Sequence, residues 1–164
     1  MVEPRRSLNA DAISLPGARF LIVEARFYDD IGAMLYAGAT AALERTGVPF
    51  DSLQVPGALE IPIAIAMAVE EARMNNAPYD GAVALGCVIR GETFHFEIVA
   101  EQSARALLDL GVKLGLAIGN GILTVENEDQ AMQRADPLRG DKGGEAARAA
   151  LALAQLKHAL LRQR

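Results

Sequence analysis

Residues 86–95 combine the residue types of an anion site with a group that can transfer protons; they read GCVIRGETFH. Gly91 permits a tight turn or a close backbone approach, and Thr93 is a candidate N-cap for a following helix. Unpaired amides at the start of such a helix favour a bound phosphate. His95 would lie in the first turn beside that anion, where an imidazole titrating near neutral pH could transfer protons. A lone histidine is more often a polar surface residue, but this position past a strand end favours a functional one.

Two other unusual segments follow apolar runs: residues 25–30 read ARFYDD, and residues 55–62 read VPGALEIP. Phe27 either stacks on a planar ligand or closes the core, and the sequence leaves both open. Glu60 stands near a helix start, where a carboxylate suits the helix dipole, so capping alone would explain it.

The single cysteine and the second histidine give weaker signals. Cys87 ends an apolar run, and neither a second sulfur nor a nearby acid–base pair suggests a nucleophile or a metal ligand. We therefore interpret Cys87 as a small buried hydrophobic residue. His158 lies beside Lys157, late in the last expected helix, and is predicted to be on the surface.

Basic residues near the C-terminus flank a break between two expected helices. Arg134 precedes the break, and Lys142 lies in the segment RGDKGG at 139–144. We expect a solvated loop here; a functional role would require oligomerisation to bring these side chains to another subunit's loop.

Four short apolar runs alternate with longer amphipathic stretches. The near-continuous apolar character of the runs predicts parallel strands that are covered on both faces. Strands are expected at 20–25, 52–55, 82–86 and 114–118, and helices at about 31–43, 60–74, 94–110, 128–135 and 144–161.

This alternation predicts an α/β fold: a three-layer α/β/α sandwich with a four-stranded parallel core sheet and right-handed crossovers. In open parallel sheets, ligands bind at the carboxyl ends of the strands. We therefore expect the site to form from the four loops after the strands, the fourth of which is Gly119-Asn120-Gly121. The helix at 60–74 is apolar nearly all round in its first half, so we expect its outer side to pack on another subunit.

Length and composition exclude several classes of protein. The chain has 164 residues, of which 51% are hydrophobic and 5% aromatic, which predicts a single domain over 1–164 with an aliphatic core and an arm at 1–14. A net charge of −5 argues against broad binding to nucleic acid or anionic membranes. One cysteine, no apolar run of transmembrane length and no secretory signal predict a cytoplasmic protein.

Taken together, the motifs resemble those of the lumazine synthase (6,7-dimethyl-8-ribityllumazine synthase) family. VPGALEIP and VIRGETFH are the most diagnostic segments, and the resemblance covers most of the chain from residue 18 onward. The matching stretches follow the family's order and spacing: ARFYDDI at 25–31, VPGALEIP at 55–62, GCVIRGETFHFEIV at 86–99, GNGILTVENEDQAMQRA at 119–135 and GDKGG at 140–144.

The resemblance implies a transferase of riboflavin biosynthesis on a flavodoxin-like fold. The implied reaction condenses 5-amino-6-ribitylamino-uracil with 3,4-dihydroxy-2-butanone 4-phosphate to give 6,7-dimethyl-8-ribityllumazine, phosphate and water. The family uses neither a metal nor an organic cofactor. An alternative on the same scaffold is a catalytically weak flavin- or lumazine-binding protein. A flavodoxin-like redox protein is disfavoured, because residues 25–30 are not a Ser/Thr-rich phosphate loop.

The same resemblance implies the contacts of the pyrimidine substrate. Phe27 corresponds to a ring that stacks on the pyrimidine, and Glu60 to an acceptor for a ribityl hydroxyl. The ribityl segment also contains Ala58 and Leu59, and the backbone that meets the pyrimidine edge corresponds to Cys87, Val88 and Ile89.

The contacts of the phosphorylated substrate are implied in the same way. His95 corresponds to the proton-transfer residue, and Glu92 and Thr93 to the loop whose amides bind the phosphate. Arg134 corresponds to the arginine that pairs with the phosphate, and Lys142 to a lysine that lines the site.

In this family the site lies between adjacent subunits of a homopentamer, and pentamers are free, paired or built into sixty-subunit shells. The adjacent chain supplies the region after the fourth strand, where Asn120 replaces an aromatic residue that many members hold against the pyrimidine. The N-terminal arm is expected to add a strand to a neighbour's sheet. We expect a free pentamer, with riboflavin synthase as a further partner.

Overall fold

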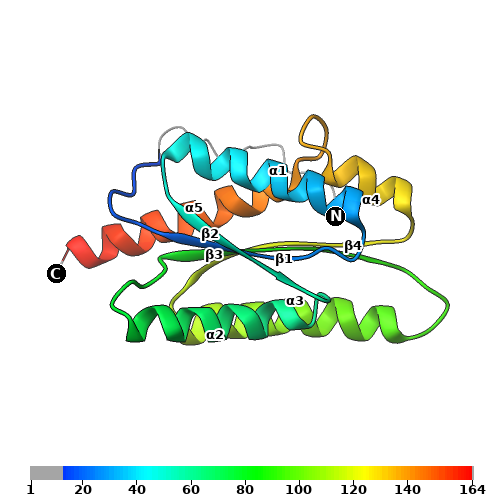
Figure 1. The fold of residues 1–164 in the computed structure, drawn as a ribbon, viewed down its shortest axis with the longest axis horizontal. Helices are drawn as coiled ribbons and strands as arrows, with labels where there is room; N and C mark the ends of the chain where they lie inside the picture. Colours follow the sequence, from blue (N-terminus) through cyan, green and yellow to red (C-terminus); the bar gives the residue numbers. More distant parts are fainter. Residues whose placement is uncertain (1–12, 164) are drawn as a thin grey trace.

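A computed structural model describes residues 13–163 of the protein. Strands and helices alternate along the chain (Figure 1). In order they are β1 (Phe20–Ala25), α1 (Asp29–Thr46), β2 (Phe50–Val55), α2 (Glu60–Met74), β3 (Gly81–Ile89), α3 (His95–Leu114), β4 (Ala117–Val125), α4 (Glu128–Ala135) and α5 (Lys142–Arg162). Residues 1–12 of the expected arm lie outside the described residues, so its pairing with a neighbour stays a prediction.

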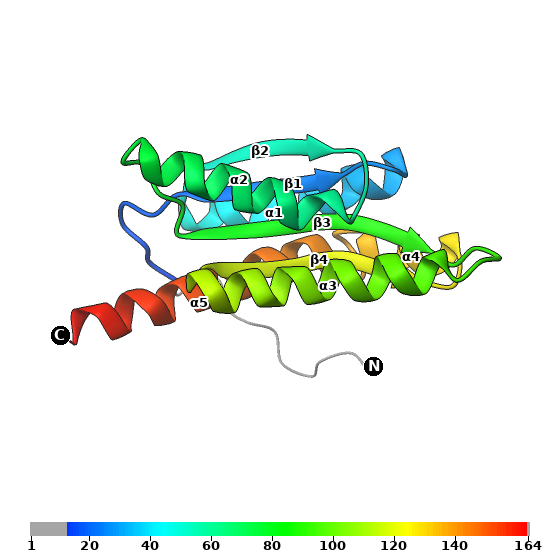
Figure 2. The ribbon, with the colours of Figure 1, turned by 90° about the horizontal axis from the view of Figure 1, so that it is seen from below.

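The four strands form one parallel sheet in the order β2-β1-β3-β4. Helices α1, α4 and α5 cover one face of the sheet, and α2 and α3 cover the other (Figures 1 and 2). The predicted three-layer α/β/α sandwich with a four-stranded parallel core, a flavodoxin-like arrangement, is confirmed.

Strand β1 is buried along its whole length because both of its faces meet helices. Phe20 and Ile22 belong to the core cluster on the side of α1 and α5. Leu21 and Val23 point the other way, into the cluster formed with α2 and α3. Side chains alternate across a strand, so two covered faces require the near-continuous apolar run seen in the sequence.

Helix bounds agree with the sequence where a local signal marks the end. Helices α2 and α4 begin and end as expected, and Gly47, left-handed with a φ of 68°, ends α1. Helix α3 is longer than expected and ends before Gly115, which has a φ of 58°. The expected N-cap role of Thr93 is wrong: Phe94 takes that position and makes no side-chain cap bond.

The fourth strand corrects the sequence analysis. It was expected at 114–118, but β4 spans Ala117–Val125, so Gly119-Asn120-Gly121 lies inside the strand and not in a loop past its end. The glycines permit a close approach of α5: a Cβ on Gly119 would lie 1.9 Å from the carbonyl oxygen of Ala146. Glycine in a strand interior often marks such an approach of another backbone.

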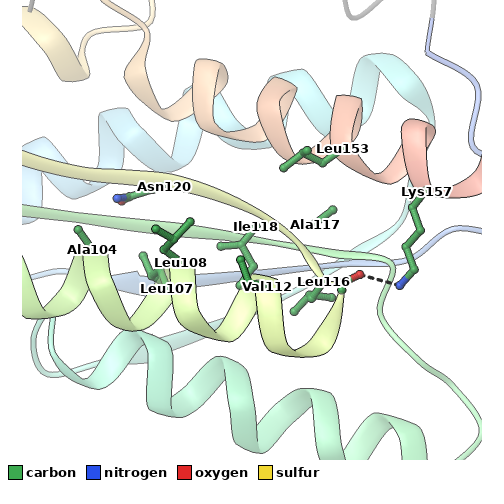
Figure 3. Close-up of a pocket in the computed structure, with 12 residues that line it drawn as sticks. Ala104, Leu107, Leu108, Val112, Leu116, Ala117, Ile118, Asn120, Leu153 and Lys157 are labelled. Carbon is green, nitrogen blue, oxygen red and sulfur yellow. Dashed lines mark hydrogen bonds between the residues drawn. The ribbon is translucent and has the colours of Figure 1, made fainter.

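His158 is less exposed than expected, because it joins the end of α5 to the start of β3. Its Nε2 lies 2.7 Å from Oδ1 of Asp80, whose Oδ2 accepts a hydrogen bond from the backbone N–H of Arg19 at 3.0 Å. Nearby, Lys157 Nζ donates to the carbonyl oxygen of Gly115 at 2.8 Å (Figure 3). The C-terminal half of α5 is therefore held by polar contacts to the rest of the chain.

The outer side of α2 is uncovered in a single chain. Ile63 is 55% exposed and Met67 is 68% exposed, although Ile61 and Ile65 are fully buried. Coverage of this outer side by a neighbouring subunit stays a prediction. Within residues 13–163, no helix has the length and apolar content needed to cross a bilayer.

Candidate functional site

A cavity of about 380 Å³ lies where β1, β2 and β3 end and α3 begins. The three strands point to the same edge of the sheet, so the loops that follow them are neighbours (Figures 1 and 2). The cavity has the size of a small-molecule site. It is lined by Ala25, Phe27, Tyr28, Gly57, Ala58, Leu59, Glu60, Cys87, Val88, Ile89, Gly91, Thr93, His95, Phe96 and Val99.

The loop between β1 and α1 presents Phe27 to this cavity. Its side chain is 72% exposed, so the ring does not close the core. The ring packs edge to face on Tyr28, with centroids 5.1 Å apart. Tyr28 has extended backbone at the N-cap of α1, which turns the chain directly after Phe27. Of the two sequence interpretations, a ring available to a ligand agrees with the structure.

The loop between β2 and α2 forms the second wall. A turn closes it, with the N–H of Glu60 donating to the carbonyl oxygen of Gly57 at 3.2 Å. A Cβ on Gly57 would lie 2.8 Å from Oε2 of Glu60, so the carboxylate folds back over the glycine. Ala58 is buried beneath the turn. The carboxylate of Glu60 therefore stands in the first turn of α2, at the cavity.

Arg90 anchors the third loop, between β3 and α3. Its Nε donates to Glu126 at 2.8 Å, its Nη1 donates to Glu97, and its guanidinium carbon lies 4.1 Å from the ring centroid of Phe96. The hydrogen bond from Arg90 lowers the pKa of Glu97. These contacts tie Arg90, at the start of the loop, to the first turn of α3 and to Glu126, directly after β4.

His95 is the first residue of α3 and lies at the cavity. The free amides at a helix start attract anions, and Gly91 leaves room above the loop, since a Cβ there would meet no atom within 4 Å. The arrangement places a proton-transfer group beside a place suited to a phosphate. Glu92 is exposed in the same loop, outside the cavity lining.

Cys87 and Tyr28 supply neutral groups to the cavity. Burial raises the pKa of the Cys87 thiol to about 11, and burial, followed by the proximity of Cys87, raises the pKa of Tyr28. We expected Cys87 to be fully buried, but it is only half-buried. A protonated thiol at neutral pH agrees with its interpretation as a small hydrophobic residue.

The fourth expected loop does not reach this cavity. Asn120 lines a separate, mostly apolar groove between α3 and α5, with Leu108, Val112 and Leu153 (Figure 3). The Oδ1 of Asn120 accepts a hydrogen bond from the N–H of Ile122 at 3.0 Å. The expectation of a loop at residues 119–121 is wrong, because Asn120 lies in the middle of β4. A contribution of Asn120 to the site from an adjacent chain stays a prediction.

Two basic residues of the expected site also lie elsewhere in the chain. Arg134 is exposed on α4 and donates from Nη1 to the carbonyl oxygen of Gln130 at 3.0 Å. Lys142 begins α5, and its Nζ lies 2.7 Å from Oε2 of Glu145. Neither lines the cavity beside His95.

Sequence reasoning missed several lining residues, among them Tyr28, Phe96 and Val99. The helical spacing of His95 and Val99, four residues apart, places both on one face of α3 and was a usable signal. Within residues 13–163, no three His, Cys, Asp or Glu side chains gather in a way that could hold a metal ion.

Comparison with known proteins agrees with this geometry. A family model for 6,7-dimethyl-8-ribityllumazine synthase matches residues 17–158. A protein of that name from Methylocella silvestris is 65% identical over 153 residues, 93% of each chain. Another from Afipia carboxidovorans is 56% identical over 160 residues, 98% of each chain. The fold is a three-layer sandwich with a cavity at the ends of its strands. The family match and these identities show that the chain belongs to the 6,7-dimethyl-8-ribityllumazine synthases.

Proposed function

We propose that this chain catalyses the reaction for which its family is named. It condenses 5-amino-6-ribitylamino-uracil with 3,4-dihydroxy-2-butanone 4-phosphate and releases 6,7-dimethyl-8-ribityllumazine, phosphate and water. The observation that carries the proposal is the cavity in which Phe27, Glu60 and His95 meet from three loops. The alternative of a binding protein gains no support from the relatives, which are named synthases.

Each wall of the cavity has a role for the pyrimidine substrate. The exposed ring of Phe27 stacks on the pyrimidine. The carboxylate of Glu60 accepts a hydrogen bond from the ribityl chain, which lies along Ala58 and Leu59. The backbone at the end of β3 meets the pyrimidine edge, at Cys87, Val88 and Ile89.

The start of α3 serves the second substrate. Backbone amides at Glu92 and Thr93, together with the positive end of the helix, bind the phosphate. The pyrimidine's amine attacks the ketone, and loss of water gives an imine. His95 then helps to remove a proton as phosphate leaves. The second amino group adds to the remaining carbonyl, and a second water leaves as the ring closes. Holding two substrates together supplies much of the rate.

The remaining expected residues act from a neighbouring chain. Asn120, Arg134 and Lys142 line no part of their own chain's cavity, so the proposed site takes them from an adjacent subunit of a homopentamer. The exposed apolar side of α2, with Ile63 and Met67, supports such an assembly. We place the free pentamer in the cytoplasm, where a single free thiol suits a reducing environment, with riboflavin synthase as the consumer of its product.

The test is formation of the lumazine from the two substrates, followed by absorbance. The same substrates without protein give the spontaneous rate. A rate above this background that rises linearly with protein concentration supports the proposal. Tight binding of lumazine or riboflavin without any excess rate would favour the binding protein.

A further inference from the structure

Glu24 is a buried carboxylate that the proposed mechanism leaves without a role. It is 3% exposed and is the penultimate residue of β1. We propose that Glu24 is a positioning residue: through Arg26 it fixes the ring of Phe27, and it thereby sets the affinity for the pyrimidine substrate. This inference rests on the proposed function.

Both carboxylate oxygens of Glu24 are occupied. Oε2 accepts a hydrogen bond from Nε of Arg26 at 3.1 Å, and Oε1 accepts one from Nε2 of Gln54 at 2.9 Å. Glu24 and Gln54 are also paired residues of neighbouring strands β1 and β2. The carboxylate is thus fixed to the sheet on one side and holds Arg26 on the other.

Arg26 is confined by α1 as well as by Glu24. A Cβ on Gly32 would lie 2.6 Å from Cγ of Arg26, so the stem of the arginine lies directly against the first turn of α1. Its guanidinium carbon lies 5.8 Å from the ring centroid of Tyr36, and the hydroxyl of Tyr36 lies 2.9 Å from Oγ of Ser52 on β2. Arg26 therefore fills a slot bounded by a helix and the sheet.

This confinement passes to Phe27 because the two residues are adjacent. The Phe27 ring is largely exposed and touches Tyr28 edge to face, so few contacts of its own restrain it. The side chain of Arg26 is 34% exposed, so removing the charge of Glu24 leaves no fully buried charge without a partner. We therefore expect the Glu24–Arg26 pair to act on the geometry of Phe27 more than on folding.

The test compares Michaelis constants for the two substrates. Glu24→Gln keeps the shape of the side chain but removes its charge. It should raise KM for the pyrimidine about fivefold, a change about the size of one ordinary hydrogen bond, and leave KM for the butanone phosphate unchanged. The same substitution at Glu44, which is exposed on α1, is the matched control and should change neither constant.

A double variant tests whether Glu24 acts through Phe27. In a Phe27→Ala background, Glu24→Gln should have almost no further effect on KM for the pyrimidine. A full effect in that background, or equal changes in both Michaelis constants, would overturn the proposal. The proposal would also be overturned if Glu24→Gln lowered the melting temperature and left both Michaelis constants unchanged.

A second pair of variants covers the case in which Glu24→Gln does not fold. Arg26→Met keeps the stem of the arginine and should give the same selective rise, and Arg26→Lys should restore part of the affinity. Equal Michaelis constants for Arg26→Met and wild type would overturn the proposal. The wild-type rate over the spontaneous reaction is measured in the same assay, so a failure of the proposed function appears there and not in the variants alone.

Discussion

His95 and Arg134 lie on opposite sides of the sheet in one chain: His95 begins α3 on one face, and Arg134 lies on α4 on the other (Figure 1). Arg134 does not line the cavity that contains His95. The proposed reaction uses both side chains on one phosphate, so we expect it to draw them from two chains of the proposed pentamer.

Mixing two variants tests this sharing of a site. His95→Ala and Arg134→Ala should each lower the rate, because each removes one half of the site. Co-expression of the two chains should restore activity, since about a quarter of randomly formed interfaces join an intact His95 to an intact Arg134. The measurement is the rate per chain of the co-expressed assembly against the two parent variants. A rate no higher than the mean of the parents would mean that both groups act within one chain.

Gly119 on β4 allows the backbone of α5 to pack closely against the strand. A Cβ on Gly119 would lie 1.9 Å from the carbonyl oxygen of Ala146, and backbone of α5 has little freedom to move away. Gly119→Ala should therefore lower the free energy of unfolding by about 3 kcal/mol, the upper part of the usual cost of overpacking. Urea unfolding followed by circular dichroism measures this change.

Gly91→Ala is the matched control for that experiment. A Cβ there meets no atom within 4 Å, so its unfolding midpoint should stay close to that of the wild type. Equal midpoints for Gly119→Ala and Gly91→Ala would show that α5 does not pack on β4 as described.

Local signals explain how much of the fold was predictable from the sequence. The bounds of α2 and α4 were correct because apolar periodicity and end residues mark them within a few positions. The place of the cavity followed from the rule that parallel strands present their carboxyl ends at one edge. Phe27, Glu60 and His95 could be brought together on that rule alone.

Long-range packing explains what was missed. The sequence Gly119-Asn120-Gly121 has the composition of a loop, and only the approach of α5 shows why a strand contains it. The pair of Asp80 and His158 joins residues 78 positions apart and leaves no local pattern. The position of Arg134 outside the cavity could not be predicted either, because no local pattern states which chain completes a site.

The thiol of Cys87 should be unreactive in the folded protein. Its pKa is raised to about 11 by burial, so the thiol stays protonated at pH 8, and only the thiolate reacts with iodoacetamide. Its alkylation should be about 100-fold slower than that of a free cysteine, whose pKa is near 8.5. The rate should rise with each unit of pH toward that raised value.

Mass spectrometry of samples quenched over time gives this rate. The control is the same reaction in strong denaturant, where the burial is lost and alkylation should become fast. Fast alkylation of the folded protein at pH 8 would contradict the half-buried, neutral thiol.

The rate of His95→Ala with both substrates saturating tests the central claim most directly. If His95 transfers protons in a site that otherwise works by positioning, the rate should fall by about 100-fold or less and remain above the spontaneous reaction. His158→Gln, at the other histidine and far along α5, is the control and should keep the wild-type rate. A His95→Ala rate equal to that of the wild type would contradict the assignment of this cavity as the active site.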